Sequence, residues 1–245
     1  MEAEVLIERH GAVALITLNA PERRNALTLE TADALITACD AVDTDDEVGA
    51  VVIRGAGGSF CAGADRSLLA GAGSDPAADE NYRALGRIYE SFIRVGELRA
   101  PTVAAVRGSA VGAGMNLLLI TDLRVIAHDA RLLSGFATIG LHPGGGHYTM
   151  LHRLAGREAA AAISVFGEEI DGMRAQQLGL AWDAVPDGEV EDRALELAAA
   201  AAADPALARA AVASFRAEGM QGVPLPVAVA FERSSQMWSL RRRSS

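Results

Sequence analysis

The chain has 245 residues, half of them hydrophobic and 22% charged, so it can bury one large core and is not a disordered tract. Its formal net charge of −10 argues against nucleic acid or an anionic membrane surface as a partner. All 22 basic residues are arginine, which excludes lysine chemistry and leaves arginine or the backbone to hold any phosphate.

The first part of the chain alternates strand patterns with helix patterns. Residues 5–8 and 13–18 are apolar or alternating around the turn His10-Gly11, which predicts a β-hairpin. Thr28 is placed to cap a helix, and its apolar face comprises Ala32, Leu35, Ile36, Cys39 and Val42. The next expected elements are a buried strand over 50–53, a loop over 70–79, a helix over 82–98 and a strand over 101–106.

The second part continues this alternation and then becomes mostly helical. A helix is expected over 114–120 and a strand over 123–127, which predicts an α/β fold with repeated crossovers. Three further helices are expected over 189–203, 205–218 and 224–240. The sequence has no signal-peptide pattern and no apolar run of about 18 residues, so we expect a soluble, cytoplasmic protein.

Two glycine-rich segments give the strongest functional signal. One is Ser-Phe-Cys-Ala-Gly-Ala-Asp over 59–65, and the other is Arg-Gly-Ser-Ala-Val-Gly-Ala-Gly-Met-Asn over 107–116. Each follows a strand pattern and opens towards a helix, so each can present unpaired backbone N–H groups, and two that converge would form an oxyanion hole. The alternative is that the glycines only allow close packing of helix on strand. Their order fits neither a dinucleotide fingerprint nor a P-loop.

Four ordered motifs, over 21–27, 60–65, 108–114 and 175–180, resemble the successive signatures of the enoyl-CoA hydratase/isomerase (crotonase) superfamily. The resemblance implies a spiral of ββα units over 1–188 and a helical region over 189–245 used for trimerisation. A homotrimer or a dimer of trimers would follow. It also implies a coenzyme A thioester as substrate or ligand, with no permanently bound cofactor, and a place in fatty acid metabolism.

The resemblance also implies particular site residues. The backbone N–H groups of Ala64 and Ala113 would donate to the thioester oxygen, and both residues are small enough to let a carbonyl approach. The residues expected to contact CoA or its acyl group are Arg23, Arg24, Ala62, Asp65 and Gly112. Arginines in a polar loop can pair with CoA phosphates, although a solvated loop face is the alternative reading.

Hydration of an enoyl thioester needs one group to activate water and another to deliver a proton to the α-carbon. Hydratases of the family place two glutamates there, and by register those positions are Asn116 and Phe136, neither of which exchanges a proton near neutral pH. A third position, an aspartate in some members, is Gly144. The resemblance thus implies intact binding without the usual chemistry. Asn116 would orient a water or a carbonyl, and Phe136 would form an apolar wall of the acyl pocket.

A histidine is the substitute base that the sequence offers. His142, His147 and His152 lie in one stretch, and we expect His142 to serve because it is nearest to the acid positions in register. The alternative for each is a histidine that packs or caps at a helix start. We expect no metal site, since a spacing of five does not bring two ligands to one helix face.

Three functions are therefore open. The first is an enzyme acting on an acyl-CoA thioester through a non-standard base. The second is a non-catalytic acyl-CoA-binding carrier or regulatory protein, and the third is a structural subunit with a vestigial site. The sequence leaves the acyl group and its chain length open.

Overall fold

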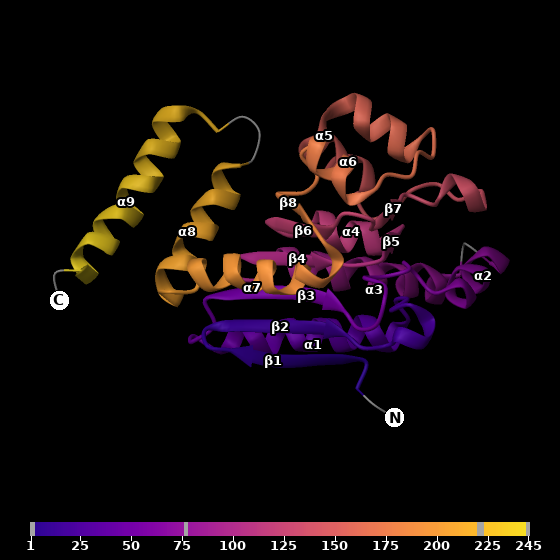
Figure 1. Ribbon diagram of the computed structural model, residues 1–245, viewed down its shortest axis with the longest axis horizontal. Coiled ribbons are helices and arrows are strands. Elements are labelled where there is room, and N and C mark those ends of the chain that lie inside the picture. The colour runs from indigo at the N-terminus through magenta and orange to yellow at the C-terminus, as the bar shows by residue number, and fades with distance from the viewer. Residues whose placement is uncertain (1–2, 76–77, 220–222, 244–245) are drawn as a thin grey trace.

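The computed structural model describes residues 3–75, 78–219 and 223–243. Its centre is a six-stranded sheet in the order β1-β2-β3-β4-β6-β8 (Figure 1). β1 pairs antiparallel with β2, and every other neighbouring pair is parallel. The strands are β1 (Val5–His10), β2 (Val13–Leu18), β3 (Ala50–Gly55), β4 (Thr102–Val106), β6 (Leu123–Ala127) and β8 (Asp183–Val185).

The central strands are covered on both faces. All of β2 and β4 is buried, as is expected of strands in a parallel sheet between helical layers. α1 (Leu29–Thr44) packs on β1 and β2 and also contacts α3 (Asp79–Gly96). α7 (Val190–Ala201) lies across β3, β4 and β6, in front of the strands in Figure 1. The mixed α/β fold that the sequence predicts is therefore confirmed.

The first helix matches its sequence signal closely. The Thr28 hydroxyl accepts a hydrogen bond from the Thr31 amide at 3.1 Å, which caps α1 as predicted. The five apolar residues predicted to face the core from this helix are all buried: Ala32, Leu35, Ile36, Cys39 and Val42. Burial raises the pKa of the Cys39 thiol to about 12, so it stays protonated and packs as a small apolar side chain.

The prediction of a loop over 70–79 is wrong in its first half, which is helical. α2 (Arg66–Ser74) continues through Ser74, while 76–77 lie outside the described residues. The Asp65 carboxylate caps this helix by accepting from the Ser67 amide at 2.8 Å, and Leu68 packs against the core. These tertiary and capping contacts offset the poor helix propensity of Gly71 and Gly73.

The rest of the chain builds a smaller sheet and a mainly helical second half. β5 (Ser109–Val111) and β7 (Arg131–Leu133) form a separate parallel pair, and both strands are too short to be recognised from a periodic pattern. The remaining helices are α4 (Ala113–Leu119), α5 (His147–Ser164), α6 (Gly172–Gln177), α8 (Pro205–Glu218) and α9 (Leu225–Arg243). No helix of the described residues is long and apolar enough to cross a membrane.

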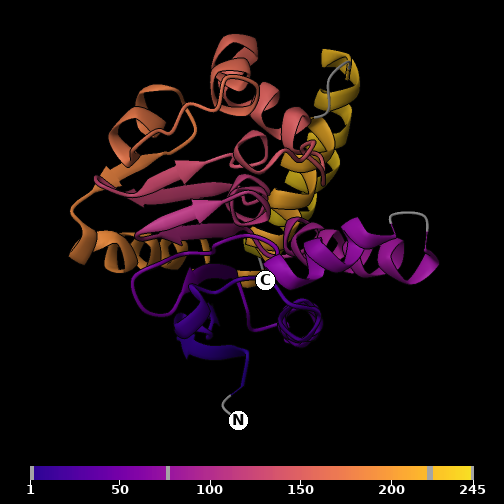
Figure 2. The same ribbon diagram turned by 90° about the vertical axis from the view of Figure 1, so that its right-hand side faces the viewer.

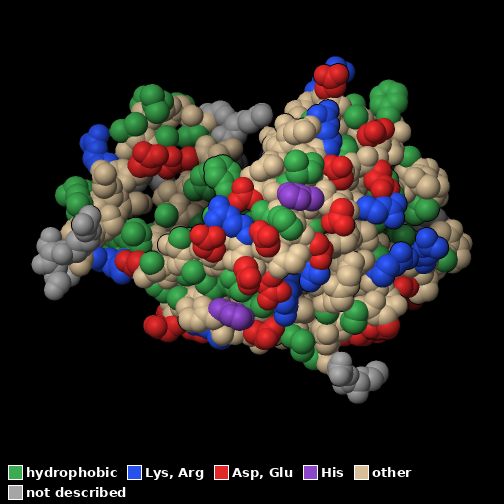
Figure 3. Space-filling view, in the orientation of Figure 1, with side chains coloured by type: hydrophobic (Ala, Val, Ile, Leu, Met, Phe, Trp, Pro, Cys, Tyr) green, Lys and Arg blue, Asp and Glu red, His purple; other side chains and the backbone are tan. Residues whose placement is uncertain are grey.

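The last two helices pack on each other, and α9 stands at the edge of the molecule in Figure 1, whereas in the perpendicular view of Figure 2 it lies behind the other elements. α9 exposes several large apolar side chains, namely Leu225, Val227, Val229, Met237, Trp238 and Leu240. Acidic and basic side chains are interspersed over the face of the molecule shown in Figure 3. The trimerisation that the resemblance implies for this region stays a prediction.

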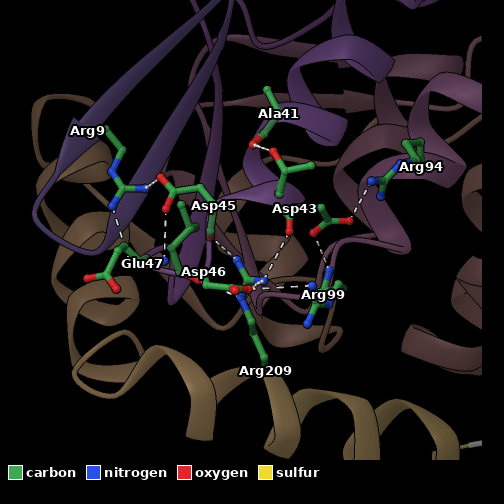
Figure 4. Close-up of polar contacts among 11 residues, drawn as sticks. Arg9, Ala41, Asp43, Asp45, Asp46, Glu47, Arg94, Arg99 and Arg209 are labelled. Atoms are coloured by element: carbon green, nitrogen blue, oxygen red, sulfur yellow. Dashed lines mark hydrogen bonds and ion pairs between the residues drawn. The ribbon is translucent and has the colours of Figure 1, made fainter.

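A buried arginine fixes α8 to the body. Arg209 is 7% exposed, and its guanidinium donates to the backbone oxygens of Val48 at 2.9 Å and Asp43 at 3.3 Å, as well as to that of Asp45 (Figure 4). These carbonyls belong to the end of α1 and the connection to β3. One side chain thus bridges three backbone carbonyls, of which that of Val48 belongs to a buried residue.

We predict that Arg209→Leu lowers the free energy of unfolding by about 3 kcal/mol, because it removes three hydrogen bonds of a buried guanidinium and leaves the buried Val48 carbonyl oxygen without this donor. Urea unfolding followed by circular dichroism measures the change. Arg153→Leu is the matched control, since Arg153 is exposed on α5. Equal stability of the two variants would show that Arg209 does not anchor α8.

Candidate functional site

The two glycine-rich segments lie side by side, joined through their backbones. The Val111 amide donates to the Cys61 oxygen at 3.0 Å, and the Cys61 amide donates to the Ser109 oxygen at 3.1 Å. A Cβ on Gly114 would lie 2.2 Å from the Cys61 oxygen, and one on Gly108 would lie 1.8 Å from the Gly58 oxygen. Glycine is therefore needed at both positions for the backbones to approach.

The two expected donor residues meet at one cavity. Ala64 and Ala113 both line a hollow of about 380 Å³. Ala113 is the first residue of α4, so its amide has no partner within the helix. Gly63, with φ +90°, holds the first segment so close that its Cβ position lies 3.4 Å from the Ala113 nitrogen. Among the described residues, neither the Ala64 nor the Ala113 amide donates a hydrogen bond.

The cavity is lined mainly by apolar and aromatic side chains. They are Leu69, Tyr82, Leu85, Tyr89, Val111, Phe136, Ile139 and Leu141. The expected site residues that also line it are Ala62, Gly112, Asn116, His142 and Gly144. No aspartate or glutamate is among the described residues that line this cavity. It can take an apolar group, but its walls offer no carboxylate to move a proton.

The charged residues expected to contact CoA have different surroundings. Arg23 is engaged by Glu4 and Glu22, whereas Arg24 is exposed and has no ion pair in the described parts of the chain. Asp65 caps α2, and its hydrogen bonds to Ser67 lower the pKa of its carboxyl group. Arg66 was not expected from the sequence, yet it lines the cavity with an exposed side chain. Sequence reasoning had no motif that would single it out.

A chain of hydrogen bonds runs behind the cavity wall. The Asn116 amide nitrogen donates to the Gly144 oxygen at 3.0 Å, and its Oδ1 lies 2.7 Å from Nδ1 of His147. Nε2 of the same imidazole lies 2.8 Å from Oγ of Ser134. Asn116, Ser134 and His147 are all buried, and Phe136 packs edge-on against the imidazole with ring centroids 5.2 Å apart.

The Gly144 carbonyl fixes the direction of this chain. A carbonyl can only accept, so the NH₂ of Asn116 must face Gly144 and its oxygen must face His147. His147 then carries its hydrogen on Nδ1 and keeps a lone pair on Nε2, which accepts from the Ser134 hydroxyl. Asn116 is thus turned inward to orient a histidine, whereas the sequence suggested that it would orient a water or a substrate carbonyl.

The structure separates the three candidate histidines. His142, the base preferred from the sequence, lies at the cavity but is exposed, with Nδ1 donating to the Pro143 oxygen at 2.7 Å. His152 is exposed on α5 and its ring bonds to the Tyr148 oxygen. His147 belongs to the buried chain, and its partner Ser134 follows β7, a strand that the sequence pattern did not reveal. The inward position of His147 could not be read from the sequence, because register contains no information on which side chains face inward.

Gly144, where the resemblance implies an aspartate in some members, is tightly packed. A Cβ on Gly144 would lie 2.2 Å from the hydroxyl oxygen of Tyr89. An aspartate at 144 would therefore require Tyr89 to move. The apolar neighbours of the Tyr89 ring raise the pKa of its hydroxyl through burial, so it stays protonated at neutral pH.

We predict that His147 makes stability fall as the solution is acidified. Burial lowers the pKa of its imidazole from the ordinary 6.5 to about 4, so the folded state favours the neutral ring. The neutral imidazole therefore contributes fully to the free energy of unfolding above pH 6.5, and this contribution is lost as the pH falls towards 4. When the pH is lowered from 7 to 4.5, the free energy of unfolding of the unsubstituted protein should fall by about 2.5 kcal/mol more than that of the His147→Gln variant. Urea titrations at the two pH values measure this, and His152→Gln should follow the unsubstituted protein. Equal losses in all three proteins would contradict the buried, neutral state of His147.

Comparison with known proteins shows the family and the fold of the chain. The profile of the family described as enoyl-CoA hydratase/isomerase matches residues 8–237. The chain is 44% identical over 201 residues to the probable enoyl-CoA hydratase EchA14 of Mycobacterium tuberculosis, covering 82% of this chain and 76% of the relative. It is 33% identical over 202 residues to the 1,2-epoxyphenylacetyl-CoA isomerase of Escherichia coli, covering 82% and 77%. The structure of an enoyl-CoA hydratase from Polaromonas sp. JS666 superposes with a TM-score of 0.88 at 30% identity, covering 96% of this chain and 91% of that one. The chain therefore belongs to the enoyl-CoA hydratase/isomerase family.

Proposed function

We propose that this protein binds an acyl-CoA thioester and polarises its carbonyl between the amides of Ala64 and Ala113. The observation that carries the proposal is that both amides border one apolar cavity without a hydrogen-bond acceptor of their own. An N–H that is fixed by the backbone needs no rearrangement to stabilise a developing oxyanion, and a low-dielectric cavity strengthens that effect. The CoA substrates or products in the names of the relatives agree with this ligand class.

The cavity walls suggest where the two ends of the ligand lie. Leu85, Phe136 and Ile139 give an apolar environment that suits an aliphatic or aromatic acyl chain. Arg24 and Arg66 are exposed cations near the first donor segment, since the Arg24 carbonyl accepts from the Ala62 amide at 2.9 Å. We assign the CoA phosphates to these two arginines in preference to Arg23, whose guanidinium is held by Glu4.

The chemistry at this carbonyl is proposed to be atypical for the family. Asn116 and Phe136 stand where the resemblance places two glutamates, and no described lining residue carries a carboxylate. Without such a group, neither the activation of water nor the delivery of a proton to the α-carbon has the usual agent. The oxyanion donors would remain useful for any reaction that places negative charge on the thioester oxygen.

We predict that Ala113→Pro weakens binding of an acyl-CoA analogue at least about tenfold, because proline lacks the N–H that the carbonyl oxygen would accept from. The ligand is a ketone analogue in which a methylene replaces the thioester sulfur, so that it keeps the carbonyl and cannot be cleaved at sulfur. Isothermal titration calorimetry measures the affinity. Ala113→Gly keeps the donor and should bind the analogue as the unsubstituted protein does. If the proline variant is folded and binds equally well, the donor site is refuted.

We also predict that hydration of crotonyl-CoA is very weak or absent, because none of the described residues that line the cavity carries a carboxylate. Loss of the conjugated enoyl absorbance over time measures it. A bona fide hydratase of the family, assayed in parallel, is the control for substrate quality. Robust hydration that His142→Ala abolishes would show that His142 is the substitute base and that our account of the chemistry is wrong.

A further inference from the structure

We propose that Ser134, His147 and Asn116 form a nucleophilic triad that hydrolyses an acyl-CoA thioester in this cavity. The inference rests on the proposed binding of the carbonyl by Ala64 and Ala113, and it assigns a reaction to a site that lacks the usual acids. The chemical class of substrate is an acyl-CoA, and the products are free CoA and a carboxylic acid.

The hydrogen-bond chain has the polarity that such a triad requires. A serine nucleophile needs a histidine that accepts its proton on one nitrogen and is oriented through N–H on the other. Ser134 donates to Nε2 of His147 at 2.8 Å, and Nδ1 of the same ring donates to Asn116 Oδ1 at 2.7 Å. An asparagine in the third position can present the wrong group to the imidazole, but here the Gly144 oxygen holds its NH₂ on the far side.

Ser134 lies next to one of the proposed oxyanion donors. β5 and β7 are paired so that Val111 is opposite Leu133, and the Gly112 amide donates to the Leu133 oxygen at 3.1 Å. Ser134 follows Leu133 directly and Ala113 follows Gly112 directly, and both Ser134 and Ala113 line the cavity. A nucleophile and an oxyanion donor beside one hollow are the arrangement that acyl transfer requires.

The triad is held in a tightly packed setting. A Cβ on Gly145, where φ is +66°, would lie 2.9 Å from the amide nitrogen of Asn116 and 2.6 Å from the Phe92 ring. Phe136 packs against the imidazole of His147 on the cavity side. Burial keeps His147 neutral, with its lone pair available at neutral pH. The same burial makes it a weaker base than free imidazole, so the oxyanion donors must supply much of the stabilisation.

The reaction balances with water as the only co-reactant. Oγ of Ser134 forms a bond to the thioester carbonyl carbon while its proton passes to Nε2 of His147, and the oxyanion accepts from Ala64 and Ala113. Cleavage of the C–S bond releases CoA thiol, which takes the proton from His147 and leaves an acyl ester on Ser134. Water then gives a proton to Nε2 and attacks the ester. The carboxylic acid leaves, and the proton returns to Ser134.

The first test measures release of free thiol from a panel of acyl-CoA thioesters of increasing chain length, using a thiol-reactive dye. We expect Ser134→Ala and His147→Gln each to lower kcat at least about 100-fold with little change in KM, since neither residue holds CoA. Asn116→Ala should lower kcat through the position of His147. The matched controls are Ser91→Ala, a buried serine on α3, and His152→Gln, an exposed histidine on α5, and both should retain full activity.

The second test needs no natural substrate. A fluorophosphonate should label Ser134, with the modified peptide identified by mass spectrometry, and Ser134→Ala should not be labelled there. The proposal is overturned if the ketone analogue binds but every thioester is returned intact and Ser134 stays unlabelled, a result that would leave the acyl-CoA-binding proposal standing. It is also overturned if thiol release survives in Ser134→Ala. Failure of the analogue to bind would count against the proposed function itself.

Discussion

The close approach of two backbone segments is the constraint on which the site depends. Cys61 exchanges hydrogen bonds with Ser109 and Val111, and this contact exists only because Gly108 and Gly114 have no side chain to obstruct it. The hydrogen bonds place the ends of the segments beside each other, so that two amides without acceptors border one cavity. The close packing that these glycines allow is thus also what brings the two amides to the cavity.

Three polar side chains beside the cavity are removed from water. Asn116, Ser134 and His147 are buried, and an unpaired polar group in that position would be costly. Each is paired, and both Ser134 and Asn116 line the cavity. Asn116 is a neutral side chain whose oxygen accepts from the buried imidazole of His147 and so orients it.

Much of the fold could be predicted from local sequence patterns, because the helices and strands concerned are specified by residues that are close together in the chain. Alternation gave the first hairpin, Thr28 capped α1 as predicted, and the expected helix over 205–218 is present with the same bounds. These patterns did not predict elements that are stabilised by tertiary contacts. β5 and β7 are only three residues each and exist because they pair with one another, while α2 extends across two glycines because Asp65 caps it and Leu68 packs inward.

The sequence by itself determined the family, the α/β class and the two glycine-rich segments, since motifs and hydrophobic periodicity are properties of neighbouring residues. It also named Ala64, Ala113, Asn116 and Phe136, which the structure brings to one cavity. Only the tertiary structure decided which histidine faces inward and which serine it meets. Ser134 and His147 touch because β7 pairs with β5 and the start of α5 packs near α4, and the direction of their hydrogen bonds depends on a carbonyl at Gly144. No periodic pattern records such a contact, because it joins residues whose spacing along the chain has no bearing on their geometry.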